Sequence, residues 1–333
     1  MTNFSALIEA ENLTVKFKSS SSGLLGKFTL FNAVENCNLS IGNGEVVSLV
    51  GESGCGKTTL GKTLIGLIRP TSGKVLYSGR DIWKLSGKDY TEFRRNAQII
   101  HQDPYASLHP VKRVYDIVSA GMRYHKLYSS ENEIKSKVIE LLATVGLNPP
   151  EYFMNKYPHQ LSGGQRQRVA IARAISLSPK FIVADEIVTM IDVSLRVGIL
   201  NLLLELKKKL GSSFLFITHD FGVARYFAAE GKTAVMYLGN IVEIGPTNNL
   251  ITEPLHPYTK SLLSAVPVPD PILAKTRKMI ALRSIDPPNP VNPPSGCKFS
   301  DRCPYFMEGK CDKKGPELIE ARPGHFVACY LYQ

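Results

Sequence analysis

The stretch that decides the fold is Gly51-Glu-Ser-Gly-Cys-Gly-Lys57-Thr58-Thr59, which fits the pattern G-x-x-x-x-G-K-[ST]. It follows an apolar run over 46–50 and precedes a helical pattern over 59–67. In such a loop the glycines let backbone N–H groups turn toward phosphate oxygens, the lysine neutralises the β- and γ-phosphates, and the next hydroxyl reaches Mg²⁺. The sequence therefore predicts a site for a nucleoside triphosphate. The residues expected to contact it are Gly51, Ser53, Gly54, Cys55, Gly56, Lys57, Thr58 and Thr59.

Acidic residues at the end of a second apolar run supply the other half of such a site. The run 181–184 ends in Asp185 and Glu186, and a third run over 213–218 is followed by His219. Asp185 is expected to hold Mg²⁺ through water, and Glu186 to polarise the attacking water as a general base. His219 stands where it could contact the γ-phosphate. Hydrolysis of the nucleotide is therefore expected.

A second anion site is predicted at Leu161-Ser-Gly-Gly-Gln-Arg-Gln-Arg-Val-Ala-Ile-Ala-Arg173. Ser162 in the N-cap position leaves N–H groups pointing out of the helix start, where the helix dipole favours a phosphate. Taken alone, the segment also fits a capped surface helix with arginines for solubility. One chain with two phosphate-binding helix starts suggests that two chains enclose the nucleotide between them.

Composition places the chain among ordinary globular proteins. Its 333 residues, 44% hydrophobic and 21% charged, fit about two domains. The net charge of +11 suits an acidic partner such as nucleic acid, anionic lipid or a nucleotide without choosing among them. No stretch approaches the roughly 18 apolar residues of a membrane-spanning helix, and the N-terminus has no signal-peptide core. The chain is expected in the cytoplasm.

Two regions are distinguished along the chain. Apolar runs alternate with helical patterns before residue 256, as in an α/β protein with a buried, mainly parallel sheet. Residues 256–333 hold 12 of the 21 prolines and four of the six cysteines. This predicts a separate C-terminal extension.

The order of these motifs resembles that of the ATP-binding cassette (ABC) family: the P-loop 51–58, Gln102, Leu-Ser-Gly-Gly-Gln at 161–165, Asp185-Glu186 and His219. The resemblance implies an α/β fold with a RecA-like P-loop ATPase core, an antiparallel β-subdomain and a helical subdomain at about 95–165, within a nucleotide-binding domain of residues 1–255. It also implies a head-to-tail dimer, in which Ser162 and Gly164 of one subunit touch the γ-phosphate at the other. The further residues that it assigns to ATP are Phe17 (stacked on adenine), Gly163, Gln165 and Asp192; to Mg²⁺, Thr58, Gln102 and Asp185; and to catalysis, Gln102, Glu186 and His219.

Three further segments resemble the oligopeptide/dipeptide importer ATPases of this family. They are the extended loop 102–110, the segment 256–267 and the cysteine-bearing tail from Pro293. The resemblance implies an ATPase subunit at the cytoplasmic face of the membrane, with a second ATPase subunit (a copy or a homologue), two permease subunits and an extracytoplasmic solute-binding protein as partners. The expected cargo is a peptide, with an oligosaccharide as the alternative.

A soluble ATPase that acts on nucleic acid is the competing class. Dispersed basic residues and a single P-loop weigh against it, so no nucleic-acid partner is expected. One loop departs from the family pattern D-E-P-x-S-A-L-D and reads Asp185-Glu-Ile-Val-Thr-Met-Ile-Asp192. This departure puts the rate and cooperativity of hydrolysis in doubt, but not ATP binding.

The four cysteines of the extension have the spacing Cys297-x5-Cys303-x7-Cys311-x17-Cys329. Structural disulfides are disfavoured in a reducing compartment. Structural zinc sites typically use C-x₂₋₄-C pairs, which are absent here, although zinc stays an alternative. An iron–sulfur cluster accepts cysteines on irregular loops, and the subfamily resemblance implies a [4Fe–4S] cluster held by all four.

Overall fold

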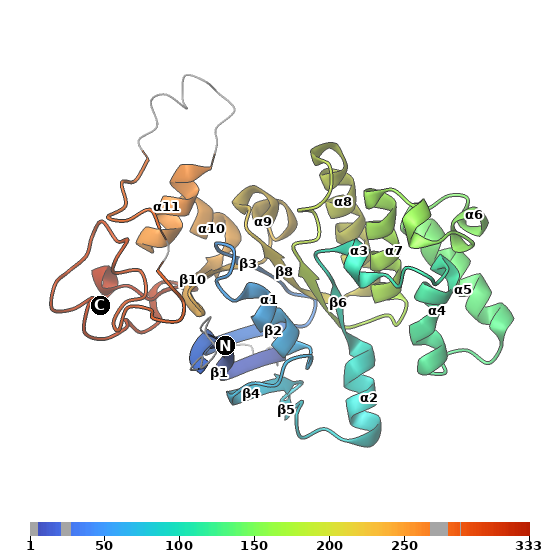
Figure 1. Ribbon diagram of the computed structural model, residues 1–333, viewed down its shortest axis with the longest axis horizontal. Coiled ribbons are helices and arrows are strands. Elements are labelled where there is room, and N and C mark those ends of the chain that lie inside the picture. Colours follow the sequence, from blue (N-terminus) through green and yellow to red (C-terminus); the bar gives the residue numbers. More distant parts are fainter. Residues whose placement is uncertain (1–5, 21–27, 267–278, 287) are drawn as a thin grey trace.

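A computed structural model describes residues 6–20, 28–266, 279–286 and 288–333 of the chain. Two sheets lie beside a block of helices, and the C-terminal extension lies at the opposite end of the molecule from that block (Figure 1). Pro267, the last residue of the predicted segment 256–267, falls outside the described residues.

The larger sheet has the strand order β11-β12-β10-β9-β3-β8-β7-β6. β3 pairs in parallel with both β8 and β9, β8 with β7, and β7 with β6. Every residue of β3, β7 and β8 is buried, because α1, β1 and β2 cover one face of these strands and helices such as α7 and α8 cover the other. This confirms the predicted α/β class. The bounds are β3 Val46–Val50, β6 Ala97–Ile100, β7 Phe181–Asp185, β8 Ser213–Thr218, β9 Lys232–Tyr237, β10 Asn240–Pro246, β11 Ile319–Arg322 and β12 His325–Val327.

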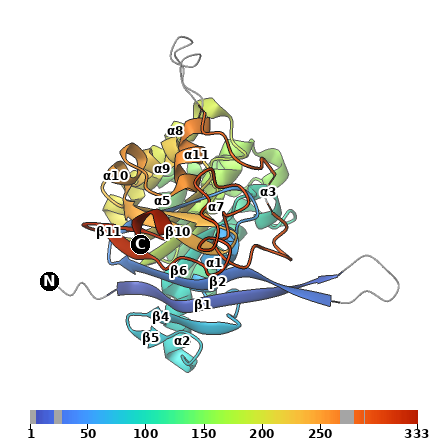
Figure 2. The same cartoon turned by 90° about the vertical axis from the view of Figure 1, so that its left-hand side faces the viewer.

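The smaller sheet is antiparallel, with the order β2-β1-β4-β5. β1 and β2 form a long hairpin that reaches beyond the rest of the sheet (Figure 2). Their inward-facing residues share one core with helix α1 and with β3, β7 and β8. The bounds are β1 Ala6–Ser20, β2 Phe28–Gly42, β4 Ser72–Tyr77 and β5 Arg80–Asp81.

Most of the helices between β6 and β7 form one block on the side of the sheet that β6 borders (Figure 1). Residues 97–100 are a strand of the larger sheet, so the helical part starts at Pro104 and not at the predicted 95. Apolar residues of α4, α5, α7 and α8 share its core. The helices are α1 Lys57–Leu64, α2 Gly87–Asn96, α3 Pro104–Ser107, α4 Val114–Tyr124, α5 Glu131–Thr144, α6 Pro150–Met154, the 3₁₀ turn Pro158–Gln160, α7 Gly163–Ile175, α8 Val193–Leu210, α9 Phe221–Phe227, α10 Thr247–Thr252 and α11 Pro257–Ala265, with a last 3₁₀ turn at Tyr330–Tyr332. In the described ranges, none of these helices has the length and apolarity to cross a membrane.

The C-terminal extension is built onto the larger sheet. β12 pairs antiparallel with β10, and β11 with β12. The carboxylate of Glu243 on β10 is fully buried and accepts hydrogen bonds from the backbone N–H groups of Leu255 (2.7 Å) and His256 (3.0 Å). It also contacts Nε2 of His325 on β12 at 2.8 Å. One buried carboxylate therefore joins the cassette sheet to both ends of the extension.

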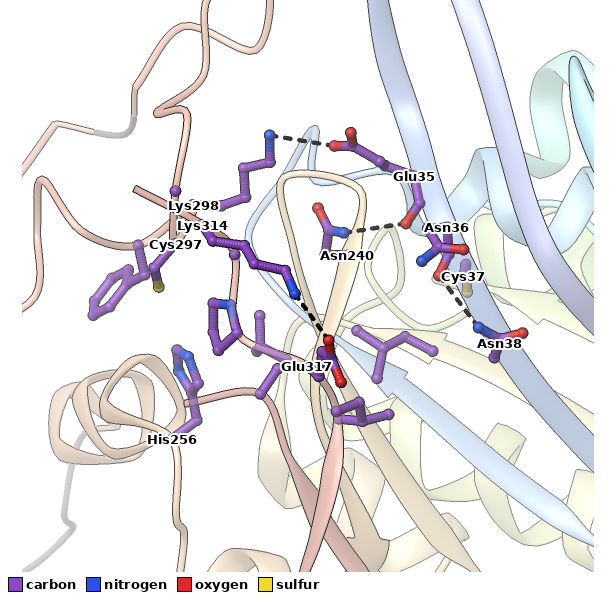
Figure 3. Close-up of a pocket in the computed structure, with 18 of the residues that line it drawn as sticks. Glu35, Asn36, Cys37, Asn38, Asn240, His256, Cys297, Lys298, Lys314 and Glu317 are labelled. Carbon is purple, nitrogen blue, oxygen red and sulfur yellow. Dashed lines mark hydrogen bonds and ion pairs between the residues drawn. The ribbon is translucent and has the colours of Figure 1, made fainter. Parts of the chain in front are cut away.

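A cavity of about 540 Å³ lies between β2, the β9–β10 turn and the extension (Figure 3). Two ion pairs line this cavity, Lys298–Glu35 (3.3 Å) and Lys314–Glu317 (3.0 Å). Asn240 donates to the carbonyl of Glu35 across the junction. The extension contacts both sheets of the protein, through Lys298 on Glu35 of β2 and through the pairing of β12 with β10.

Replacing Glu243 with alanine removes an acceptor from three buried donors. Since each buried polar group left without a partner costs about 1–3 kcal/mol, we expect the free energy of unfolding to fall by at least about 3 kcal/mol. Glu253→Ala is the matched control, because that carboxylate is 66% exposed in its ion pair with Arg322. Its loss should cost less than about 1 kcal/mol. Chemical denaturation followed by circular dichroism measures both, and equal effects would contradict the role of Glu243.

Candidate nucleotide-binding site

The P-loop connects β3 to α1 and packs its backbone against two other strands. A Cβ atom at Gly51 would lie 2.2 Å from the carbonyl oxygen of Met236 on β9. At Gly56, where φ is +107°, it would lie 2.1 Å from the carbonyl oxygen of Ala33 on β2. Both positions require glycine for space, and Gly56 requires it for conformation as well. The loop shape is therefore fixed by the sheets around it.

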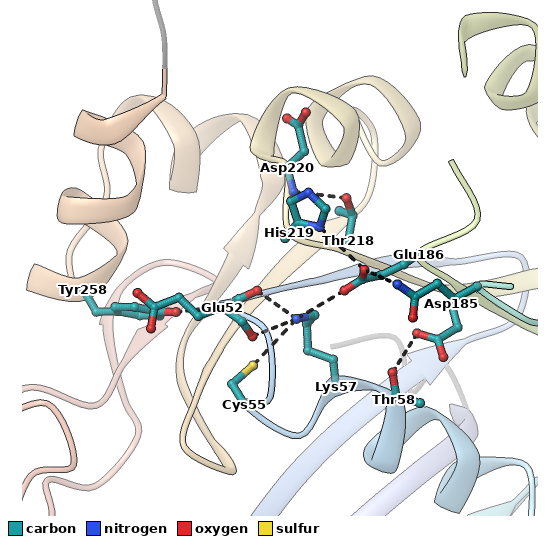
Figure 4. A network of polar contacts seen from close by, with 12 residues as sticks. Glu52, Cys55, Lys57, Thr58, Asp185, Glu186, Thr218, His219, Asp220 and Tyr258 are labelled. Carbon is teal, nitrogen blue, oxygen red and sulfur yellow. Dashed lines mark hydrogen bonds and ion pairs between the residues drawn. The ribbon is translucent and has the colours of Figure 1, made fainter. Parts of the chain in front are cut away.

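Lys57 is buried at the first position of α1 and points back over the loop (Figure 4). Its ammonium donates to the carbonyls of Gly51 (2.8 Å) and Glu52 (2.9 Å) and lies 3.6 Å from Oε1 of Glu186. Neutral carbonyls are weaker partners for an ammonium than a phosphate oxygen is. The lysine is thus held where an anion on the loop can take over its hydrogen bonds.

Asp185 ends β7 directly beside the start of α1. Its Oδ1 accepts a hydrogen bond of 3.0 Å from the Thr58 hydroxyl. Burial raises the pKa of this carboxyl, the Thr58 hydrogen bond lowers it, and the neighbouring Glu186 raises it again. A carboxylate and a hydroxyl at this spacing fit a Mg²⁺ ion, which prefers oxygen ligands and keeps several waters.

Glu186 is the point at which three other predicted residues meet. Gln102 donates from Nε2 to its Oε2 (3.1 Å), and Nδ1 of His219 lies 3.6 Å from the same oxygen. The ammonium of Lys57 lies beside the other carboxylate oxygen, Oε1. Glu186 adopts a positive φ of 45°, a strained conformation for a residue with a side chain and one that occurs often at functional sites. Its partly exposed carboxylate can accept a proton from a water above the loop.

The second predicted anion site lies apart from this group. Ser162 caps α7: its Oγ accepts from the N–H of Gln165 (3.3 Å), while the Gln165 side chain accepts from the N–H of Ser162 (3.0 Å). This confirms Ser162 as the N-cap residue. Gly163 faces open space, and α7 belongs to the helical block and not to the P-loop edge (Figure 1). One chain therefore does not bring Ser162, Gly163, Gly164 and Gln165 to Lys57.

Two other predicted nucleotide contacts stand at exposed positions. Phe17 on β1 is 38% exposed and lies beside Phe31, with 6.2 Å between ring centroids. Asp192 is exposed at the N-cap of α8, and its side chain makes no cap hydrogen bond. Between Glu186 and Asp192, the unusual residue Ile187 is completely buried in the core of the helical block. Ile191 is buried as well, whereas Met190 is 55% exposed, so packing accounts for only part of the departure from the family pattern.

The four cysteines of the extension do not form a metal site in the structure. Among the described residues, which include all four, no three or more His, Cys, Asp or Glu side chains are placed to hold a metal ion. The geometry therefore does not support the predicted iron–sulfur cluster. Burial, together with the nearby cysteines, raises the pKa of Cys297 to about 12 and of Cys303 to about 11. The thiols of Cys297 and Cys303 are therefore neutral near pH 7, and both lie close to other cysteines of the extension.

Sequence reasoning did not single out Glu52, Tyr258 or Arg302. Glu52 occupies a variable position of the P-loop, and both partners come from the extension. The one local signal for Arg302 is its position directly before Cys303, because a charged residue next to a cysteine in an apolar setting indicates a specific partner. Partners separated by 250 residues in the chain leave no local pattern that could reveal the contact.

Two protein families match separate parts of the chain. Residues 34–189 match the ABC transporter family, and residues 242–311 match the family described as "Oligopeptide/dipeptide transporter, C-terminal region". A putative oligopeptide transport ATP-binding protein of Bacillus subtilis, YkfD, is 46% identical over 98% of this chain and 96% of its own. The oligopeptide transport ATP-binding protein OppF of Haemophilus influenzae is 41% identical over 98% of this chain and 97% of its own.

Solved structures agree with the fold. The cassette MJ0796, in a dimeric post-hydrolysis state bound to ADP and Pi, is 30% identical with a TM-score of 0.62 and covers 72% of this chain and 98% of its own. CbiO1 of Clostridium perfringens, described as part of the ABC transporter complex CbiONQ, is 28% identical with a TM-score of 0.61 and covers 75% of this chain and 92% of its own.

Replacing Lys57 with alanine removes the buried ammonium above the loop. Since a hydrogen bond to a charged group contributes about 1.5–3 kcal/mol, we expect affinity for a nucleoside triphosphate to fall at least about tenfold. A fluorescent ATP analogue titrated into the purified chain measures this. Lys74→Ala, on the exposed part of β4, should bind like the unaltered chain. Undiminished binding by the Lys57 variant would show that the anion site lies elsewhere.

Proposed function

The chain belongs to the ABC transporter family of ATPases, and we propose that it is the ATP-hydrolysing subunit of a binding-protein-dependent importer of oligopeptides or dipeptides. Curated relatives that are 41–46% identical over nearly the whole chain carry the name of oligopeptide transport ATP-binding proteins. The observation that carries the proposal is the convergence of Lys57, Asp185 and Glu186 on one edge of the sheet.

In the proposed reaction the triphosphate lies on the P-loop, and Lys57 exchanges its two carbonyl partners for phosphate oxygens. Asp185 and Thr58 would hold Mg²⁺, which would neutralise phosphate charge. Glu186 accepts a proton from the water that attacks the γ-phosphorus, and ADP leaves with the β-phosphate oxygen. Gln102 and His219 orient the Glu186 carboxylate and the water, because both side chains contact Oε2 of Glu186.

The separation of α7 from the P-loop supports a site completed by a second subunit. In a head-to-tail dimer the capped start of α7, at Ser162 and Gly164, reaches the γ-phosphate on the opposite P-loop. ATP then holds the two subunits together, and hydrolysis releases them. The second subunit is either a copy of this chain or a homologue.

We place the dimer at the cytoplasmic face of the membrane, bound to two permease subunits and supplied by an extracytoplasmic solute-binding protein. Closure of the ATP-bound dimer would turn the permease outward, and product release would reset it. The names of the relatives favour peptides over oligosaccharides as cargo.

Exchanging Glu186 for glutamine keeps the size of the side chain and removes the base. General-base catalysis contributes about 10²–10⁴-fold, so we expect the rate of ATP hydrolysis to fall at least about a hundredfold while ATP affinity persists. Phosphate release at saturating Mg-ATP and binding of a fluorescent ATP analogue give the two readouts. Glu253→Gln, the same exchange at an exposed carboxylate outside the nucleotide site, is the matched control and should keep the rate of the unaltered chain. Turnover that survives in the Glu186 variant would exclude this residue as the base.

The role of the four cysteines stays a prediction of the sequence. Their shared neighbourhood in the extension supports a common ligand, and metal binding would have to displace protons from thiols whose pKa values are raised. We propose the [4Fe–4S] cluster, with zinc as the alternative. The structure offers no step of the ATPase reaction that needs it.

Anaerobic purification followed by iron, sulfide and zinc analysis decides between these states. About four irons and four sulfides per chain, with broad absorption near 400 nm, is the result expected of a [4Fe–4S] cluster. One zinc per chain supports the alternative. A metal-free chain would contradict both, and its buried thiols should then react with iodoacetamide only after denaturation.

A further inference from the structure

Glu52 in the P-loop is held by two residues of the C-terminal extension. Its backbone N–H donates to the hydroxyl of Tyr258 on α11 (2.9 Å). Its carboxylate accepts two hydrogen bonds from Arg302, at 2.9 Å from Nη1 to Oε2 and 3.0 Å from Nη2 to Oε1. Parallel pairs of this kind are the strongest and most directional contacts of arginine. The extension therefore fixes both the backbone and the side chain of one P-loop residue.

The side chain of Arg302 is buried, unlike that of a typical surface arginine. Its side chain is 6% exposed, against 31% for Glu52. The guanidinium carbon lies 5.8 Å from the ring centroids of both Tyr237 and Phe299, and Nη1 approaches the Tyr237 hydroxyl at 3.5 Å. Glu52 and Tyr237 raise the pKa of Arg302 despite its burial, so it stays charged. A buried guanidinium that donates two parallel hydrogen bonds to one carboxylate has little freedom to reorient.

The contact continues from Glu52 to the catalytic lysine. The carbonyl of Glu52 accepts from the Lys57 ammonium, and Tyr258 and Arg302 hold the N–H and the carboxylate of the same residue. Figure 4 shows Tyr258, Glu52 and Lys57 in one row that leads to Glu186. A shift of Glu52 would therefore move one of the two carbonyls that position Lys57.

We propose that Arg302 and Tyr258 are positioning residues for ATP, which act by holding Glu52 so that the P-loop is already in its nucleotide-binding shape. This inference rests on the proposed ATPase function. Neither residue needs to touch the nucleotide. A loop with several glycines loses much conformational freedom when it is ordered around a ligand, and a loop that is ordered beforehand binds more tightly. The extension thus takes part in the ATP site.

The test compares full-length Arg302→Met with Arg283→Met. Arg283 is the matched control, because it lies in the same extension, stacks over Phe306 at 4.4 Å and is exposed. We expect Arg302→Met to raise the Kd and KM for Mg-ATP about tenfold, equivalent to about 1.4 kcal/mol, with a much smaller change in kcat. Arg283→Met should keep the Kd. Tyr258→Phe, which removes one hydroxyl, should raise it by a smaller factor.

A double-mutant cycle separates positioning from mere stability. Glu52→Gln and Arg302→Met act through one contact, so the double variant should bind ATP no more weakly than the weaker single variant. Arg302→Lys keeps the charge but loses the paired geometry, and should fall between the original chain and Arg302→Met. Thermal unfolding of every variant runs in parallel.

Three outcomes would overturn the proposal. The first is additive losses of ATP affinity in the cycle. The second is a lowered melting temperature with unchanged Kd and KM, which leaves Arg302 with a structural role only. The third is a loss of affinity as large in Arg283→Met as in Arg302→Met. A different result, no ATP binding or hydrolysis by the unaltered chain, would instead contradict the proposed function itself.

Discussion

Parallel pairing of β3 with β8 and of β8 with β7 is the constraint on which the site depends. It brings the ends of three strands to one edge, where the P-loop, the Asp185–Glu186 pair and His219 begin. Elements packed on both faces bury these strands along their whole length, so the polar residues of the site lie at or just beyond the strand ends. Lys57 then has one position over the loop, between two carbonyls and Glu186.

The C-terminal extension packs on the same sheet and also contacts the P-loop at its edge. Glu243 joins it to β10 through a buried carboxylate, and Arg302 joins it to the P-loop through a buried guanidinium. The contacts of Glu243 and of Arg302 lie at two separate places, β10 and the P-loop. Together they fix the orientation of the extension toward the nucleotide site. Among the described residues, these buried polar contacts act together with the pairing of β12 with β10 and the apolar packing of Phe299 to hold a segment rich in proline.

Local patterns in the sequence predicted the parts of the site that are continuous in the chain. The three buried strands, the P-loop and the cap at Ser162 follow from short-range apolar runs, glycines and capping residues. The start of the helical block was placed too early, because the short strand β6 carries too few residues for a clear pattern. The bond from Arg302 to Glu52 and the pairing of β12 with β10 depend on three-dimensional packing between distant segments. The iron–sulfur cluster was implied by the family resemblance and not by the cysteine spacing alone, and the described residues form no group placed to hold a metal ion.

A structure of the full-length chain with Mg²⁺ and a non-hydrolysable ATP analogue tests the central claim most directly. The account predicts a head-to-tail dimer in which Lys57 contacts the phosphates, Glu186 faces the γ-phosphorus and Ser162 of the partner subunit completes the site. A nucleotide bound away from Lys57, or a dimer in which neither Ser162 approaches a phosphate, would contradict it.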